Sequence, residues 1–340
     1  MMSALPLIQC MMEQAYRHKI PPEMLLSRAR ACGVDAVLWH AVTHEMIDAE
    51  RYGLTQAMRE AFMLEQTARL AIWRRSVQKA LQTLSMPSIL LKGAPLGERL
   101  MGDSIWRMTH DIDLWISKDQ VDAAETELAQ AGWHRAQEPH LWATNQILLE
   151  HEVLAPIELH WSMAPRPWQT PSFEKAMQTA EPYAILDVQA HILSEDDLWL
   201  HLLVHAHQHY FALKTVLDLM EAHDKLQIHP EHLKPYHLGR LHAFVTLLIQ
   251  AASQPETYSI SGQMIKCWFG NVLSHTQRGE LVFGADSRLM AAAGVVLRAF
   301  SMGLMDGLKM PVLSALDVIF AGPHPIGAKC HTIFDAVVKK

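Results

Sequence analysis

The segment from residue 86 to residue 165 constrains the fold most, because it is where short apolar strands alternate with helices. Residues 88–91 form a β-branched, apolar run typical of a buried strand, and Pro87 ends the helical pattern before them. The pattern continues as a helix, a strand, a second helix and two strands, at residues 96–101, 111–117, 118–132, 147–154 and 156–163. We therefore expect a small mixed β-sheet within an α/β core.

Both flanks of this core have helical patterns. Residues 68–84 place apolar side chains at spacings of three and four, which predicts an amphipathic helix. Residues 194–223 open with Ser194 and nearby acids, a typical helix start. Two further helices are predicted at residues 238–252 and 287–304. The expected fold class is α+β, with an N-terminal helical region (1–85), the core (86–165) and a C-terminal α-helical domain (166–340).

Composition and charge limit which partners and which cellular compartment are expected for this chain. The net charge of −7 gives the chain no electrostatic reason to coat nucleic acid or an anionic membrane, so extended nucleic-acid binding is not expected. The four cysteines are far apart and form no CxxC pair, which favours reduced thiols. No segment approaches the roughly 20 apolar residues that cross a bilayer, and the N-terminus lacks a signal-peptide pattern. We expect a cytoplasmic protein that does not bind membranes.

Three acids in apolar strands are the strongest functional signal. Asp111 and Asp113 lie two residues apart in a predicted strand, so their side chains share one face. Glu158 stands between two apolar residues in the last predicted strand. For one such acid, a solvated sheet face is the ordinary explanation. If the two strands are neighbours, however, the three carboxylates form a seat for Mg²⁺ and a nucleoside triphosphate.

The turn after the first strand adds a candidate anion site. Gly93 follows that strand and precedes a helix, so backbone N–H groups can approach a phosphate there. Lys92 either pairs with a phosphate or is simply a solvated charge at a strand end. The turn matches neither the GxxxxGK[ST] pattern nor GxGxxG.

A histidine stripe in the C-terminal region has two interpretations. His201, His205 and His209 are spaced four residues apart, on one face of a helix, and such a spacing can bind zinc. No carboxylate or cysteine stands among them, so histidines packed in the helix or lining a cleft are the other interpretation. Trp161 and Trp168 likewise either stack on a base or belong to the core.

Together these motifs resemble the DNA polymerase β-like nucleotidyltransferase superfamily. The segments LLKG, RxxxDIDL and ELHW are more closely similar to an uncharacterised bacterial nucleotidyltransferase family. The resemblance implies a turn glycine, a metal-binding acid pair, a third acid and an arginine ahead of the pair, at Gly93, Asp111, Asp113, Glu158 and Arg107. It also implies two Mg²⁺ ions, for which Mn²⁺ can substitute.

The same resemblance implies further nucleotide-binding residues. Lys92 and Arg107 would offer positive charge to the phosphates, although Arg107 is equally suited to brace the Asp pair as a counter-ion. The histidine-rich helix would close the cleft and contact the nucleotide through His205, His209, Lys214 and Asp218. Ala94 stands in the phosphate-binding turn where the superfamily prefers serine.

The implied reaction is transfer of a nucleoside monophosphate from an NTP to an acceptor hydroxyl. A small molecule, a protein or peptide side chain and an RNA end all remain possible acceptors. The alternative is a non-catalytic partner module that retains the fold. Ala94 and the long separation of Gly93 from Asp111 favour that alternative, whereas the acid trio opposes it.

Overall fold

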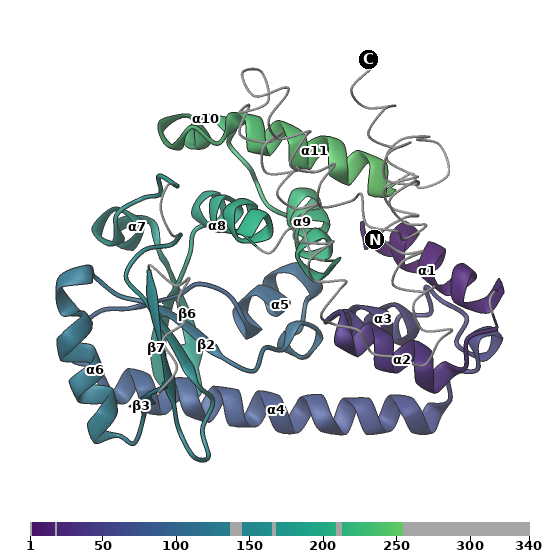
Figure 1. The fold of residues 1–340 in the computed structure, drawn as a ribbon, viewed down its shortest axis with the longest axis horizontal. Coiled ribbons are helices and arrows are strands. Elements are labelled where there is room, and N and C mark those ends of the chain that lie inside the picture. Colours follow the sequence, from purple (N-terminus) through teal and green to yellow (C-terminus); the bar gives the residue numbers. More distant parts are fainter. Residues whose placement is uncertain (1, 18, 137–144, 165–167, 209–212, 254–340) are drawn as a thin grey trace, which may run out of the picture.

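The computed structural model describes residues 2–17, 19–136, 145–164, 168–208 and 213–253 (Figure 1). The helices before the sheet are α1 (Leu5–Arg17), α2 (Pro22–Ala31), α3 (Asp35–Thr43) and α4 (Gln56–Thr83), with the 3₁₀ turn η1 (Glu50–Tyr52). The later helices are α5 (Ala94–Met101), α6 (Val121–Gln130), α7 (Phe173–Thr179), α8 (Glu195–Gln208), α9 (Leu213–Lys225), α10 (Pro230–Leu233) and α11 (Gly239–Ser253). Three further 3₁₀ turns are η2 (Ser104–Arg107), η3 (Lys118–Gln120) and η4 (Lys234–Tyr236).

Helix α4 connects the N-terminal helices to the sheet and runs along one side of the molecule (Figure 1). Thr55 caps it, because its side-chain oxygen accepts a hydrogen bond from the Met58 N–H at 3.3 Å. Its buried residues recur at spacings of three and four, at Phe62, Gln66, Leu70, Trp73, Val77 and Ala80. The amphipathic helix predicted over 68–84 is therefore confirmed as the second half of α4.

The described strands form one seven-stranded mixed sheet in the order β3-β4-β5-β2-β1-β7-β6. They are β1 (Ile89–Leu90), β2 (Ile112–Trp115), β3 (His134–Arg135), β4 (Gln146–Glu150), β5 (Ile157–His160), β6 (Glu181–Ile185) and β7 (Val188–Ile192). At its centre, β2 pairs antiparallel with β1 and parallel with β5. The expected α+β fold with a mixed sheet and flanking helices is confirmed.

One part of the sheet lies in the C-terminal region, where the sequence pattern predicts helices. Strands β6 and β7 form an antiparallel hairpin, and β7 adds to β1 with Leu90 opposite Ile192. The turn holds Leu186 at φ 53°, a left-handed conformation that leucine rarely adopts. Glycine is the residue that usually signals such a hairpin turn in a sequence, and it is not present here. The C-terminal region therefore contributes two strands to the sheet as well as helices.

Apolar side chains cover both faces of the sheet centre. Leu90 and Leu114 join the cluster that includes residues of α4 and α6, whereas Ile89 and Trp115 join the cluster that includes residues of α7 and α8. Successive strand residues point to opposite faces, so the alternation places Asp113 on the same face as Trp115. The candidate acid therefore points toward the face covered by the C-terminal helices.

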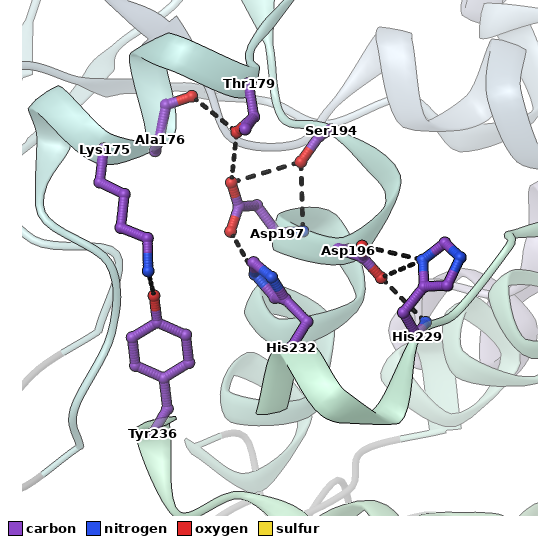
Figure 2. A network of polar contacts seen from close by, with 9 residues as sticks. All are labelled: Lys175, Ala176, Thr179, Ser194, Asp196, Asp197, His229, His232 and Tyr236. Carbon is purple, nitrogen blue, oxygen red and sulfur yellow. Dashed lines mark hydrogen bonds and ion pairs between the residues drawn. The ribbon is translucent and has the colours of Figure 1, made fainter. Parts of the chain in front are cut away.

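A polar network fixes the start of α8 (Figure 2). The Ser194 hydroxyl accepts a hydrogen bond from the Asp197 N–H at 3.4 Å, which confirms the predicted helix start. The buried Asp197 carboxylate accepts a hydrogen bond from the Thr179 hydroxyl and contacts Nε2 of His232, both at 2.9 Å. These bonds join α7 and α10 to the helix that carries the histidine stripe.

The predicted C-terminal helices have different outcomes. The long pattern at 194–223 corresponds to α8 and α9, and the pattern at 238–252 corresponds to α11. The helix predicted at 287–304 lies outside the described residues. Among the helices that are described, none combines the length and the apolar character that a bilayer crossing requires.

Candidate active site

The two strands that carry the candidate acids are direct neighbours. Strand β5 pairs in parallel with β2, and the register places Glu158 opposite Asp113. Asp113 is 2% exposed and Glu158 is partly buried. Asp111 precedes the first residue of β2, so it lies at the end of the strand rather than within it, and its carbonyl oxygen accepts a hydrogen bond from the Trp73 indole at 3.0 Å. The structure therefore places Asp113 of the first motif beside Glu158 of the second, whereas Asp111 lies outside that group.

A histidine completes this group. Ligand atoms of Asp113, Glu158 and His160 all lie within 4.8 Å of one another. Nε2 of His160 is 3.4 Å from Oδ1 of Asp113 and 3.6 Å from Oε2 of Glu158. His160 is not among the residues predicted from the sequence, although it follows Glu158 by two residues in one strand and therefore shares its face. The same rule that paired the aspartates could have found it.

Lys92 lies against this group from the end of β1. Its Nζ is 3.0 Å from Oδ1 of Asp113 and 3.0 Å from Nε2 of His205 on α8. Burial would lower the pKa of Lys92, but the surrounding carboxylates, Asp113 first, outweigh it and raise that pKa above its ordinary value. Lys92 is therefore a buried cation that is held charged by the acids.

The two aspartates have opposite electrostatic settings. Burial and the charge of Asp113 raise the pKa of Asp111. Burial acts in the same sense on Asp113, but Lys92 and His160 outweigh it and hold its pKa below the ordinary value. Asp113 is therefore the carboxylate that stays ionised, whereas Asp111 is protonated more readily.

The glycine turn has a structural explanation in its backbone. Gly93, which directly precedes α5, has a φ of 91°. Residues other than glycine rarely adopt this backbone conformation. A Cβ there would also meet the Trp73 ring and the Thr109 hydroxyl at 3.3 Å. Ala94 is 1% exposed and packs in the apolar cluster that includes Trp73. The methyl group therefore contributes to the core, which is a setting that a serine hydroxyl would disrupt.

Arg107 and Asp218 form a buried, bidentate ion pair. Nε and Nη2 of Arg107 donate to the two carboxylate oxygens of Asp218, both at 2.8 Å, and both side chains are about 5% exposed or less. Burial lowers the pKa of Arg107, but Asp218 more than compensates and raises it. The acid that Arg107 pairs with thus lies on α9. The pair connects η2, just before the β2 acids, to the C-terminal helices.

The histidine stripe faces the site in part. His205 contacts Lys92, whereas His201 is 4% exposed and neither of its ring nitrogens has a hydrogen-bond partner among the described residues. Burial, together with the charge of Lys92, lowers the pKa of His201 to about 3, so its imidazole is neutral at physiological pH. His209 lies outside the described residues.

Lys214 is a second cation near the site. The charge of Arg107, followed by burial, lowers the pKa of Lys214 to about 8. Its side chain packs over Gly33, where an added Cβ would lie 2.9 Å from the Lys214 Cδ. Lys214 is therefore a lysine whose charge changes close to physiological pH.

The two tryptophans differ in their surroundings. The ring of Trp168 lies edge-on to that of His207, with centroids 4.7 Å apart, and packs against the larger apolar cluster. This arrangement favours a core role for Trp168. Trp161 directly follows β5 and is partly buried.

The chemistry of the residues fits a divalent cation. Asp113 has the ion pair with Lys92 and the 3.4 Å contact with His160, but neither of its buried carboxylate oxygens accepts a hydrogen bond from a described residue. Both ring nitrogens of His160 are also buried without a hydrogen bond to the described part of the chain. Buried polar atoms are normally paired, so these atoms are suited to coordinate a metal together with Glu158.

The mixed sheet thus carries a group that could hold a metal ion, beside the buried cation Lys92. Comparison with known families agrees. Residues 13–245 match the family described as uncharacterised nucleotidyltransferases, and the chain belongs to that family. A search of curated proteins finds no match.

Proposed function

We propose that this protein is a Mg²⁺-dependent nucleotidyltransferase that transfers a nucleoside monophosphate from an NTP to an acceptor hydroxyl. The observation that carries the proposal is the group of Asp113, Glu158 and His160, on adjacent strands of a chain from a nucleotidyltransferase family. The acceptor is a small molecule, a protein or peptide side chain, or an RNA end. Mn²⁺ serves as an alternative ion.

The residues divide into two sets. Asp113 and Glu158 would hold the metal together with Asp111, and His160 would add a nitrogen ligand. When bound, the metal neutralises charge on the triphosphate and lowers the pKa of the acceptor hydroxyl. The hydroxyl proton passes to Glu158, the acceptor oxygen bonds to the α-phosphorus, and the bond to pyrophosphate breaks. Glu158 is the base because its side chain is 27% exposed, which gives the acceptor access to it.

The second set binds the phosphates. It contains Lys92, at the Gly93 turn, whose ammonium contacts Asp113, and Lys214, on α9, which interacts with the charge of Asp111. His205, which lies on α8 and contacts Lys92, is a further nucleotide contact, and His209 is another by the family resemblance. Because a phosphate carries negative charge in every state of the reaction, these cations bind the substrate and stabilise the transition state.

Transfer of label tests the reaction class. Purified protein is incubated with Mg²⁺, cell extract and each NTP labelled at the α-phosphate. We expect one NTP to label an acceptor and to release unlabelled pyrophosphate. The same NTP labelled at the γ-phosphate should leave the acceptor unlabelled, which excludes a kinase. Labelling from the γ-phosphate alone would contradict the proposal.

A pH dependence tests the role of Lys214. Below pH 8 Lys214 is protonated and attracts the triphosphate, whereas above pH 8 it is neutral. We therefore expect NTP affinity to fall roughly tenfold between pH 7 and pH 9, because one partly screened charge contact is lost. Titration calorimetry at pH 7, 8 and 9 measures the change. Lys214→Met should bind weakly at every pH, and an unchanged pH dependence in that variant would assign the effect to another group.

The lowered pKa of Lys214 also makes the free energy of unfolding depend on pH. The pKa of Lys214 in the folded protein, about 8, lies below its ordinary value of 10.5. The unfolded chain therefore binds more protons between these two pH values. The contribution of Lys214 to the free energy of unfolding consequently rises as the pH rises from 8 to 10.5.

A non-catalytic nucleotide-binding module is the second candidate. The observation in its favour is Ala94, whose buried methyl group leaves the phosphate-binding turn without a side-chain hydroxyl. Such a module would bind Mg²⁺–NTP but transfer no label to any acceptor. Calorimetry with a non-hydrolysable NTP, run beside the labelling experiment, separates the two functions.

A further inference from the structure

The positive charge of Lys92 lies so close to Asp113 that it would repel a metal ion bound to that carboxylate. Its Nζ lies 3.0 Å from Oδ1 of Asp113, and the two side chains are 14% and 1% exposed. The other contact of this carboxylate in the described part of the chain is Nε2 of His160, which is farther away, at 3.4 Å. In the nucleotide-free protein, Lys92 is thus the counter-ion of the central acid.

The second contact of Lys92 fixes its position. An ammonium group only donates hydrogen bonds, so Nε2 of His205, 3.0 Å away, must be the unprotonated, accepting nitrogen. His205 then carries its proton on Nδ1. The ammonium is consequently held between β2 and α8, and not in solvent.

A metal ion on Asp113 and an ammonium on the same oxygen exclude each other. A divalent cation binds a carboxylate oxygen at about 2.1 Å. The ion would lie within about 5 Å of a Lys92 Nζ that stays 3.0 Å from that oxygen. Repulsion between cations at such a separation is strong in a buried site, because little solvent screens it.

We propose that Lys92 is an internal substitute for the metal, and that it leaves Asp113 for the triphosphate when metal and NTP bind together. This inference rests on the proposed nucleotidyl transfer. The flexible four-carbon stem of lysine allows such an exchange, and the Gly93 turn follows it directly. Metal and nucleotide then bind cooperatively, because each removes the obstacle to the other. The free protein is protected from binding a metal without its substrate.

One substitution separates this role from simple phosphate binding. Lys92→Met removes the ammonium and keeps an unbranched side chain. We expect it to bind Mn²⁺ alone at least tenfold more tightly than the wild type. The same variant should bind the preformed complex of Mn²⁺ with a non-hydrolysable NTP at least tenfold more weakly. Structural damage would weaken both affinities, so the opposite signs identify the exchange.

Mn²⁺ binding is measured by the electron paramagnetic resonance signal of the free ion, and binding of the complex by calorimetry, both at pH 8. Lys79→Met removes an exposed lysine from α4 and should change neither affinity. Lys92→Arg keeps the charge and should bind Mn²⁺ alone as weakly as the wild type. Lys92→Met/Asp113→Asn should lose the gain, which assigns the ion to this site.

The outcomes distinguish this inference from the function on which it rests. If Lys92→Met binds Mn²⁺ no better than the wild type, Lys92 is not a metal substitute, while Asp113-dependent binding of the complex keeps the proposed function. If neither the wild type nor any variant binds Mn²⁺, with or without nucleotide, the metal-substitute inference and the proposed function are both overturned. Circular dichroism verifies folding, and Lys92→Gln replaces the methionine variant if the latter does not fold.

Discussion

Asp113→Asn is expected to lower kcat for nucleotidyl transfer by about 10³-fold, since a catalytic metal is worth several kcal/mol and 1.36 kcal/mol is tenfold. Asp113 is the central residue because it faces both other members of the metal-binding group and remains ionised. Asparagine has the same shape but offers only one oxygen and no charge. The substitution therefore removes the ligand and leaves the strand intact.

The measurement is single-turnover transfer of an α-labelled phosphate at saturating NTP. Asp224→Asn makes the same chemical change at an exposed position on α9 and should leave kcat unchanged. Asp111→Asn should cost less than Asp113→Asn, because Asp111 lies outside the three-residue group and is protonated more readily. A larger loss at Asp111, or an active Asp113→Asn, would contradict this assignment.

The centre of the fold could be predicted because its signals are local. Alternation within a strand placed Asp113 and Glu158 on definite faces, and the register of β2 and β5 then set them opposite each other. The same alternation also indicated His160, which was overlooked. The β6–β7 hairpin was missed although the residues of β7 alternate between apolar and polar, because β6 contains Pro182 and the turn places Leu186, not glycine, in the left-handed region.

The pairing of distant charges could not be predicted from the sequence either. Lys92 and Asp113 are 21 positions apart, and Arg107 and Asp218 are 111 apart. No local pattern encodes such contacts, because the first depends on the pairing of β1 with β2 and the second on how α9 packs against η2. For Arg107, the sequence left a phosphate ligand and a counter-ion of the Asp pair equally open. The structure shows a third arrangement, a bidentate pair with a residue of α9.

Breaking the Arg107–Asp218 pair on one side is expected to lower the free energy of unfolding by about 3–5 kcal/mol, since a buried charge then loses its partner. Either Arg107→Ala or Asp218→Ala should show this loss in urea denaturation. Replacing both with apolar residues, Arg107→Met/Asp218→Leu, should restore stability to within about 1 kcal/mol of the wild type. The exposed pair of Arg135 and Glu125 is the control, and Arg135→Ala should cost about 1 kcal/mol or less.

The restored double variant also shows what Arg107 contributes to the site. Two of its nitrogens are committed to Asp218, so we expect Arg107 to position α9, and with it Lys214, rather than to bind phosphate. The double variant should then retain NTP affinity to within about tenfold, or 1.4 kcal/mol. A stable double variant that has lost NTP binding would instead make Arg107 a phosphate ligand through Nη1, which has no partner among the described residues. Single variants alone cannot separate these roles, because unfolding and loss of a ligand lower activity in the same way.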